Sequence, residues 1–248
     1  MAHRHLFRSE LRKITTTRMP WVFGAILLAI ATINAIAVAF GTDMDGSKAF
    51  IATAADQRSL MAFAGNAFMG AGLFGAVAVA REYVHATVVP TYLACPVRHR
   101  ALGAQFAAIA VAGAVLSAIG AILTIVAVAL ALPSTEYGFL VSAGGVTTVI
   151  ASSAFAGACG AVFGAGIGAV VRNTGGAVAT AVLLLIIAPP LVVQLVGETA
   201  SWIPTALANV VSGTATDVST LAAVFALLVW AAVPALVGLV SVQRRDVV

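Results

Sequence analysis

The chain has 248 residues, of which 61% are hydrophobic and only 9% charged, and its mean hydropathy is +1.07. A soluble domain carries about 25% charged residues, so this chain has too little polar surface to cover a water-facing globule. The composition excludes a secreted disulfide scaffold, a free cytosolic enzyme and a disordered tail, and it predicts an integral membrane protein. The two cysteines, Cys95 and Cys159, fall in different kinds of segment, and we expect neither a disulfide nor a metal site from them.

Residues 1–19 combine apolar and basic side chains at helical spacing. The candidate interfacial residues are Leu6, Phe7, Arg8, Glu10, Leu11 and Lys13. The pattern predicts a short helix in the inner membrane interface, with its apolar face toward the acyl chains and its cations at headgroup level. A disordered basic leader is the alternative interpretation of the same residues.

Residues 20–248 are predicted to form a single transmembrane domain of six helices, which makes the fold all-α. The apolar segments are Trp21–Phe40, Leu60–Ala80, Leu102–Leu132, Gly145–Val171, Gly176–Val196 and Ser219–Val240. About 20 helical residues cross a hydrocarbon core about 30 Å thick. The segments are continuously apolar rather than alternating, which favours helices over barrel strands. The third segment is longer than required, so we expect it to tilt or to begin in the cytoplasm.

The positions of the cations predict the orientation of these spans. Of the 13 Lys and Arg residues, only Lys48 and Arg58 fall on the side opposite both termini. Because cytoplasmic loops carry an excess of Lys and Arg, both termini are expected in the cytoplasm. Cleavage of the first span as a signal peptide is the alternative, but its apolar run exceeds the usual core of about 7–15 residues, so we expect it to be retained.

The predicted spans contain no Asp, Glu, Lys, Arg or His. A proton-coupled antiporter usually needs an ionisable relay inside the bilayer, and an intramembrane protease needs a nucleophile with a base or a liganded metal. Both classes are therefore disfavoured, whereas a sodium site built from backbone carbonyls stays open. The chain also lacks the G-x-x-x-x-G-K-[ST] loop that cradles ATP phosphates, so it is not expected to bind ATP by a P-loop, and energy for any uphill transport is expected to enter from outside the membrane.

Small and polar residues inside the spans suggest packing or a transport path. Gly160, Gly164 and Gly168 form two overlapping G-x-x-x-G units, which we interpret as a helix-packing face within the subunit or between subunits. Asn34 and Asn66 are candidates for lining a pathway. Hydrogen bonding between packed helices explains such residues equally well.

Two features follow in the second half of the chain. Pro189 and Pro190 interrupt the fifth span, and they indicate either a hinge with a widened cavity or a kink absorbed by neighbouring helices. Residues 199–213 carry apolar side chains at helical spacing, which predicts a short external amphipathic segment in the outer interface. Trp202 is expected at headgroup level there.

The connector at residues 81–103 is the most specific stretch of the sequence. It places Glu82 at the membrane exit, then a proline-bounded apolar run, then a cluster of cations. Such a connector can form a short helix against the inner membrane face, available to a soluble partner. The alternative is an ordinary basic loop held by Arg98 and Arg100 on anionic lipid.

The connector resembles that of the permease subunits of the type-2 family of ATP-binding-cassette exporters, which typically reads Glu-Tyr-Arg-x-Gly-Thr, an apolar helix, Pro-x-Arg and then Ala-Lys. The matching residues are Glu82, Tyr83, Thr87, Pro96, Arg98 and Ala104, whereas Val84, Ala86 and Gln105 depart from the pattern. Leu6–Arg18 is similar to the family's leading interfacial helix, Arg172–Ala177 to its short inner turn, and Arg244–Val247 to its usual ending.

The resemblance implies one half of an exporter core in the inner or plasma membrane of a bacterial cell. Its partners would be a separate cytoplasmic ATPase that binds ATP and Mg, a second copy or a sibling permease, and membrane lipids, with no nucleic acid and no cofactor on this chain. The implied ATPase-coupling residues are Glu82, Tyr83, Thr87, Tyr92, Pro96, Arg98 and Arg100. The expected cargo is a drug, antibiotic, lipid or peptide. Two other classes stay open, namely a non-transporting scaffold or immunity protein and an ion-coupled secondary transporter.

Overall fold

The computed structural model describes residues 2–43, 46, 48–88 and 97–244, and every secondary-structure element in these ranges is a helix. The long helices are α2 (Met19–Phe40), α4 (Ala64–Val84), α6 (Arg98–Ala131), α7 (Ala143–Val171) and α11 (Thr220–Arg244). Between and before them lie the shorter elements α1 (Ala2–Thr16), η1 (Ala49–Ile51), α3 (Ala54–Met61), η2 (Leu132–Ser134), α8 (Thr174–Val182), η3 (Leu183–Ile187), α9 (Ala188–Val196), η4 (Gly197–Trp202) and α10 (Pro204–Val211). Six stretches are long and apolar enough to cross a membrane, which confirms the predicted all-α multi-pass membrane fold.

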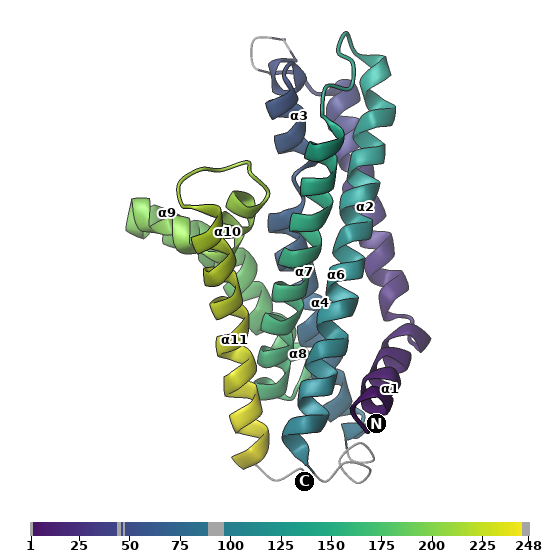
Figure 1. The fold of residues 1–248 in the computed structure, drawn as a ribbon, viewed down its shortest axis with the longest axis vertical. Coiled ribbons are helices and arrows are strands. Elements are labelled where there is room, and N and C mark those ends of the chain that lie inside the picture. The colour runs from purple at the N-terminus through teal and green to yellow at the C-terminus, as the bar shows by residue number, and fades with distance from the viewer. Residues whose placement is uncertain (1, 44–45, 47, 89–96, 245–248) are drawn as a thin grey trace.

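Helix α7 lies at the centre of the bundle and contacts α4, α6 and α11 (Figure 1). Of its apolar window 67% is buried inside the protein, against only 11% for α2, which packs on α6 at the periphery. The difference follows from composition, because α7 is rich in glycine and alanine and other helices can approach it closely. Helix α2 leaves large apolar side chains exposed, as expected for a surface solvated by lipid.

The G-x-x-x-G residues of α7 face α4 within the same subunit. A Cβ on Gly160, Gly164 or Gly168 would collide with the backbone of α4. On another face of α7, a Cβ on Gly166 would meet the backbone of α11 at Pro234. The small residues therefore allow direct backbone contact, the packing mode typical of membrane helices.

Both described ends of the chain lie at one end of the bundle, as the even number of spans requires (Figure 1). We call this end, which carries α1 and Arg244, the basic end. The opposite end, which carries η1, α3 and η2, is called the far end.

The second predicted span is displaced in the structure. Instead of one helix from Leu60, α3 ends at Met61, Ala62 is extended, and α4 begins at Ala64. Phe63 between the two helices is buried against α6 at Gly120, so tertiary packing fixes the break. Because α4 continues through Val84, and α6 begins at Arg98, the connector is shorter than the predicted residues 81–103 on both sides.

The third span is as long as the sequence indicates. Helix α6 contains 34 residues and begins with Arg98, before the predicted apolar boundary at Leu102. At 1.5 Å per residue its length is about 51 Å, well beyond the thickness of a hydrocarbon core of about 30 Å. Such a length requires that the helix tilts or that its basic first turn lies beyond the apolar layer.

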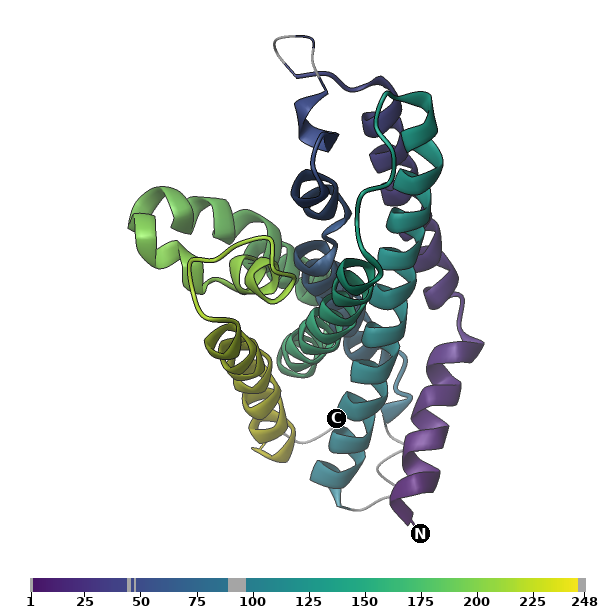
Figure 2. The ribbon, with the colours of Figure 1, turned by 45° about the horizontal axis from the view of Figure 1, so that its top comes forward.

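The fifth span contains a π-helical turn at η3, directly before Pro189 and Pro190. The backbone N–H of Ala188 bonds to the carbonyl of Leu183, five residues earlier. The proline pair lies in the first turn of α9, directly after this wide turn. Proline has no backbone N–H to donate to the preceding turn, and the wide turn makes that loss cost little. Leu185 is buried against α4 at Gly72, whereas α9 projects from the bundle (Figures 1 and 2).

The external amphipathic segment forms η4 and α10. Its apolar face, which includes Leu207 and Val210, is buried between α4 and α11 rather than facing only lipid. Trp202 is half exposed, and its carbonyl accepts a hydrogen bond of 3.0 Å from Nε1 of Trp230 on α11. The helical spacing was predictable, but the partner of the apolar face is protein.

Candidate functional site

Helix α1 packs along α6 at the basic end. Leu6, Phe7 and Leu11 are half-buried, whereas Arg8 is exposed. Glu10 is the exception to the pattern expected for an interfacial helix, in which charged side chains are exposed, because it is only 4% exposed. A buried carboxylate requires a partner, and the structure provides one from the next turn of the same helix.

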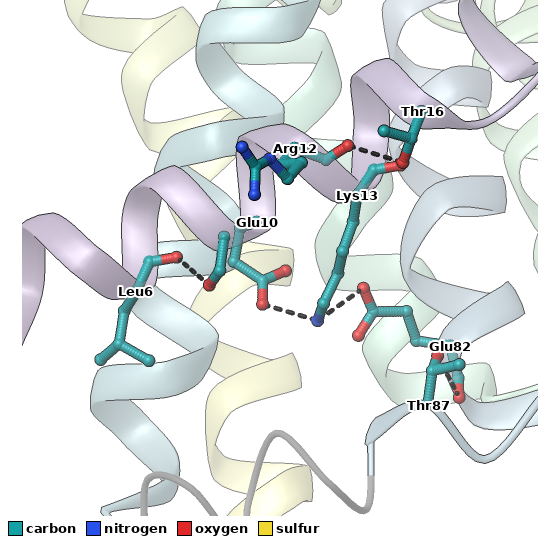
Figure 3. Close-up of polar contacts among 8 residues, drawn as sticks. Leu6, Glu10, Arg12, Lys13, Thr16, Glu82 and Thr87 are labelled. Atoms are coloured by element: carbon teal, nitrogen blue, oxygen red, sulfur yellow. Dashed lines mark hydrogen bonds and ion pairs between the residues drawn. The ribbon is translucent and has the colours of Figure 1, made fainter.

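Lys13 joins α1 to the end of α4 (Figure 3). Its Nζ lies 2.6 Å from Oε1 of Glu10 and 3.5 Å from Oε1 of Glu82. The side chain of Glu82 is only 15% exposed, and the buried Gln105 on α6 lines the same cavity as Glu82. One ammonium therefore holds two carboxylates from two helices, and α1, α4 and α6 meet at this point.

A second cationic contact joins α4 to α7 and α11. The guanidinium carbon of Arg172 lies 5.2 Å from the centroid of the Tyr83 ring, a cation–π distance. Its Nη2 donates to the carbonyl oxygen of Ser241 at 3.1 Å. Arg172 adopts a left-handed conformation with a φ of 56°, which ends α7 and turns the side chain toward these two partners.

The chain leaves α4 through a tight turn. Ala86 is in the left-handed region with a φ of 54°, and the hydroxyl of Thr87 donates to the carbonyl oxygen of Glu82 at 3.3 Å. Glu82 and Tyr83 thus lie in an ordered helix end instead of a loop.

The remaining predicted coupling residues are placed only in part. Tyr92 and Pro96 lie outside the described residues. Arg98 is the first residue of α6, and Arg100 is exposed on the first turn of that helix. Of the predicted coupling residues that the structure describes, Glu82, Tyr83 and Thr87 lie together at the end of α4.

The two candidate pathway asparagines differ in their surroundings. The Nδ2 of Asn34 donates to the carbonyl oxygen of Ile30 within α2, at 2.9 Å, whereas Asn66 is exposed on the surface of α4. The described residues thus show no bond from Asn34 to a second helix. Among those same residues, no group of three or more His, Cys, Asp or Glu could hold a metal ion.

The sequence predicted Glu10 and Lys13 as interfacial residues, but it did not predict their contacts in this site. Glu10 and Lys13 have the i, i+3 spacing of a helical ion pair, which could have indicated their mutual contact. Nothing in the sequence relates them to Glu82, which is 69 residues from Lys13. Arg172 marks a helix end in the sequence, but its contact with Tyr83 depends on how α4 and α7 pack.

No protein-family model matches this chain, and no curated protein matches it at a significant level. A function is therefore inferred from the geometry of the basic end and from the connector motif. The arrangement joins α1 to α4 through Lys13 and Glu82, and α4 to α7 and α11 through Arg172.

Proposed function

We propose that this chain is the membrane-spanning permease subunit of an ATP-driven exporter, with ATP hydrolysed by a separate cytoplasmic subunit. The observation that carries the proposal is the ion pair between Lys13 and Glu82. It joins the leading helix to the end of α4 from which the connector departs, and these are the two elements that would dock on an ATPase. The six apolar helices and the connector motif support the same function.

The packing of α4 suggests how movement would reach the membrane. Helix α4 contacts α7 backbone to backbone at Gly164 and Gly168, so these two helices would move together. Helix α7 in turn contacts α6 and α11. A displacement of the Lys13–Glu82 junction would then tilt the central helices and change which side of the membrane an internal cavity faces.

The proposed mechanism requires a difference in binding free energy between two arrangements of the transporter. ATP binding shifts the transporter between two arrangements only if the ATPase pair contacts one arrangement more favourably than the other. The half-buried Lys13–Glu82 junction can supply that difference, because an ion pair with restricted solvent contact is stronger than one in bulk water. The cargo class that suits a largely apolar protein interior is a hydrophobic or amphipathic molecule.

The test is the activity of the complex with its ATPase. We expect the chain to copurify with a P-loop-bearing subunit whose ATPase activity is stimulated by cargo in proteoliposomes. Glu82→Ala should abolish the stimulation while the complex still assembles. Glu136→Ala removes an exposed carboxylate near the far end and serves as the matched control, with stimulation preserved.

A charge exchange makes the test stricter. Lys13→Glu alone should uncouple the complex, and the double variant Lys13→Glu with Glu82→Lys should restore coupling, because the opposite charges again face each other. Uphill flux driven by an ion gradient without any ATPase would contradict the proposal and favour a secondary transporter. A complex that binds its partner but moves no cargo would favour a scaffold.

A further inference from the structure

A cavity of about 340 Å³ lies at the basic end, enclosed by α1, the start of α2, α4 and α6. Its volume is at the lower end of the range of about 300–1,000 Å³ that is typical of small-molecule sites. The Lys13–Glu82 ion pair forms part of its wall. The cavity is therefore both partly enclosed and directly beside charged groups.

The lining is graded from apolar to charged along the helix axes. Ala78 on α4 and Ile109 on α6 provide an apolar floor. Arg81 and Glu82 lie about one turn closer to the end of α4, and Gln105 lies one turn closer to the start of α6, which is about 5 Å along each axis. Both helices change from apolar to charged side chains over this stretch, as membrane spans do between the acyl chains and the headgroups, so the charged rim is at headgroup depth and the floor at acyl depth.

The charges on the rim are of both signs. Lys13 bonds to Glu10 at 2.6 Å and lies farther from Glu82, at 3.5 Å. Among the residues that the structure describes, none forms an ion pair or hydrogen bond with the guanidinium of Arg81. The rim thus presents the guanidinium of Arg81 and the carboxylate of Glu82 from adjacent positions of α4. His85 also lines the cavity.

We propose that this cavity binds the headgroup of a zwitterionic aminophospholipid, with its phosphate against Arg81 and its primary ammonium against Glu82. The first acyl carbons would lie on Ala78 and Ile109. A guanidinium is well suited to phosphate, and an ammonium forms charge-assisted hydrogen bonds to a carboxylate. This lipid-binding role does not depend on the proposed exporter function.

The lining also argues against other lipids. The two carboxylates of Glu10 and Glu82 balance the two cations Lys13 and Arg81, so the lining has no excess positive charge to favour the additional negative charge of an anionic headgroup. A quaternary choline group cannot donate hydrogen bonds, and it is usually recognised by aromatic cages. Among the described lining residues there is no Phe, Tyr or Trp to form one.

Native mass spectrometry of the detergent-solubilised full chain tests the proposal, with phosphatidylethanolamine, phosphatidylcholine and phosphatidylglycerol of identical acyl chains titrated separately. We expect one phosphatidylethanolamine molecule to bind at least about 10-fold more tightly than either other lipid, as the loss of one charge-assisted hydrogen bond implies. Equal binding of all three lipids, or tighter binding of phosphatidylglycerol, would overturn the proposal.

Two variants locate the bound lipid. Ala78→Leu fills the apolar floor and should weaken phosphatidylethanolamine binding, whereas Ala35→Leu makes the same change in a different groove, between α2 and α6, and should leave binding unchanged. Arg81→Gln keeps the floor intact and should reduce binding about 10-fold. Undiminished binding in Arg81→Gln overturns the assignment even where Ala78→Leu does not fold.

Discussion

Arg172 lies over the ring of Tyr83, with its guanidinium carbon 5.2 Å from the ring centroid, and it holds this position from a left-handed backbone. Because it also bonds to Ser241, it connects the basic ends of α4, α7 and α11. An arginine in the left-handed region pays a conformational cost that glycine avoids. At Arg172 the side-chain contacts therefore stabilise the folded protein, whereas the left-handed backbone destabilises it.

Two substitutions at Arg172 separate these effects. Arg172→Ala should destabilise the protein by about 2 kcal/mol, through loss of the cation–π contact and of a charge-assisted hydrogen bond. Arg172→Gly loses the same contacts but relieves the backbone, so it should be about 1 kcal/mol more stable than Arg172→Ala. Thermal unfolding in detergent micelles measures the order. A lower midpoint for the glycine variant than for the alanine variant would contradict the left-handed assignment.

Ala86 provides a site where glycine should stabilise the protein. Its φ of 54° is costly for alanine, and its side chain is exposed, so Ala86→Gly should stabilise the fold by about 1 kcal/mol. The matched control is Ala107→Gly, at an exposed position inside α6, which should destabilise by about 1 kcal/mol. Opposite shifts of the unfolding midpoint are the expected result. Shifts of the same sign would show that the turn after α4 is not left-handed.

The six-span fold was predictable because bilayer physics leaves few alternatives for long apolar segments. The start of the second span was not. The capping box at Thr53, which begins α3, involves only neighbouring residues and can be predicted from the sequence. The break before α4 depends instead on Phe63 packing beside Gly120. In the fifth span the proline pair predicted an interruption, but the π-turn before it and the packing of Leu185 beside Gly72 were not predicted.

The candidate site was predictable only where the information is local. Glu82 could be predicted as a candidate because it is an acidic residue that directly follows an apolar segment, where the chain leaves the membrane. The basic pattern of α1 indicated cations directed at lipid, but Lys13 instead bridges Glu10 and Glu82. A hydropathy pattern says which face of a helix is apolar, and it does not say whether lipid or protein covers that face.

The contact between α7 and α4 can be tested with two glycines. A methyl group on Gly164 would meet the backbone of Gly72, so Gly164→Ala should force the helices apart and destabilise by about 1–3 kcal/mol. Gly70 on α4 has open space around its Cβ position, so Gly70→Ala should be neutral or stabilising by up to about 1 kcal/mol. Thermal unfolding of both variants is the measurement. Equal stabilities would contradict direct backbone contact at Gly164.

Gln57 at the far end provides a test that is independent of the basic end. Its side chain is fully buried at 0% exposure, and Nε2 donates to the carbonyl oxygens of Ile51, at 3.1 Å, and Gly138, at 2.8 Å. Its Oε1 accepts from the backbone N–H of Leu140 at 2.9 Å. This single side chain therefore joins η1 to the segment between η2 and α7, although the two segments are far apart in sequence.

Gln57→Leu keeps a similar volume but leaves these three backbone groups without their partner. The expected loss of stability is about 2–4 kcal/mol, since each unsatisfied buried group costs about 1–3 kcal/mol and water can reach part of the loop. Hydrogen exchange at the Leu140 amide should accelerate more than exchange in the middle of α7, because the far end would open locally. Gln194→Leu, on the exposed surface of α9, should change neither stability nor exchange by a measurable amount. If the Leu140 amide keeps its protection in Gln57→Leu, another group secures the loop and the assigned role of Gln57 is wrong.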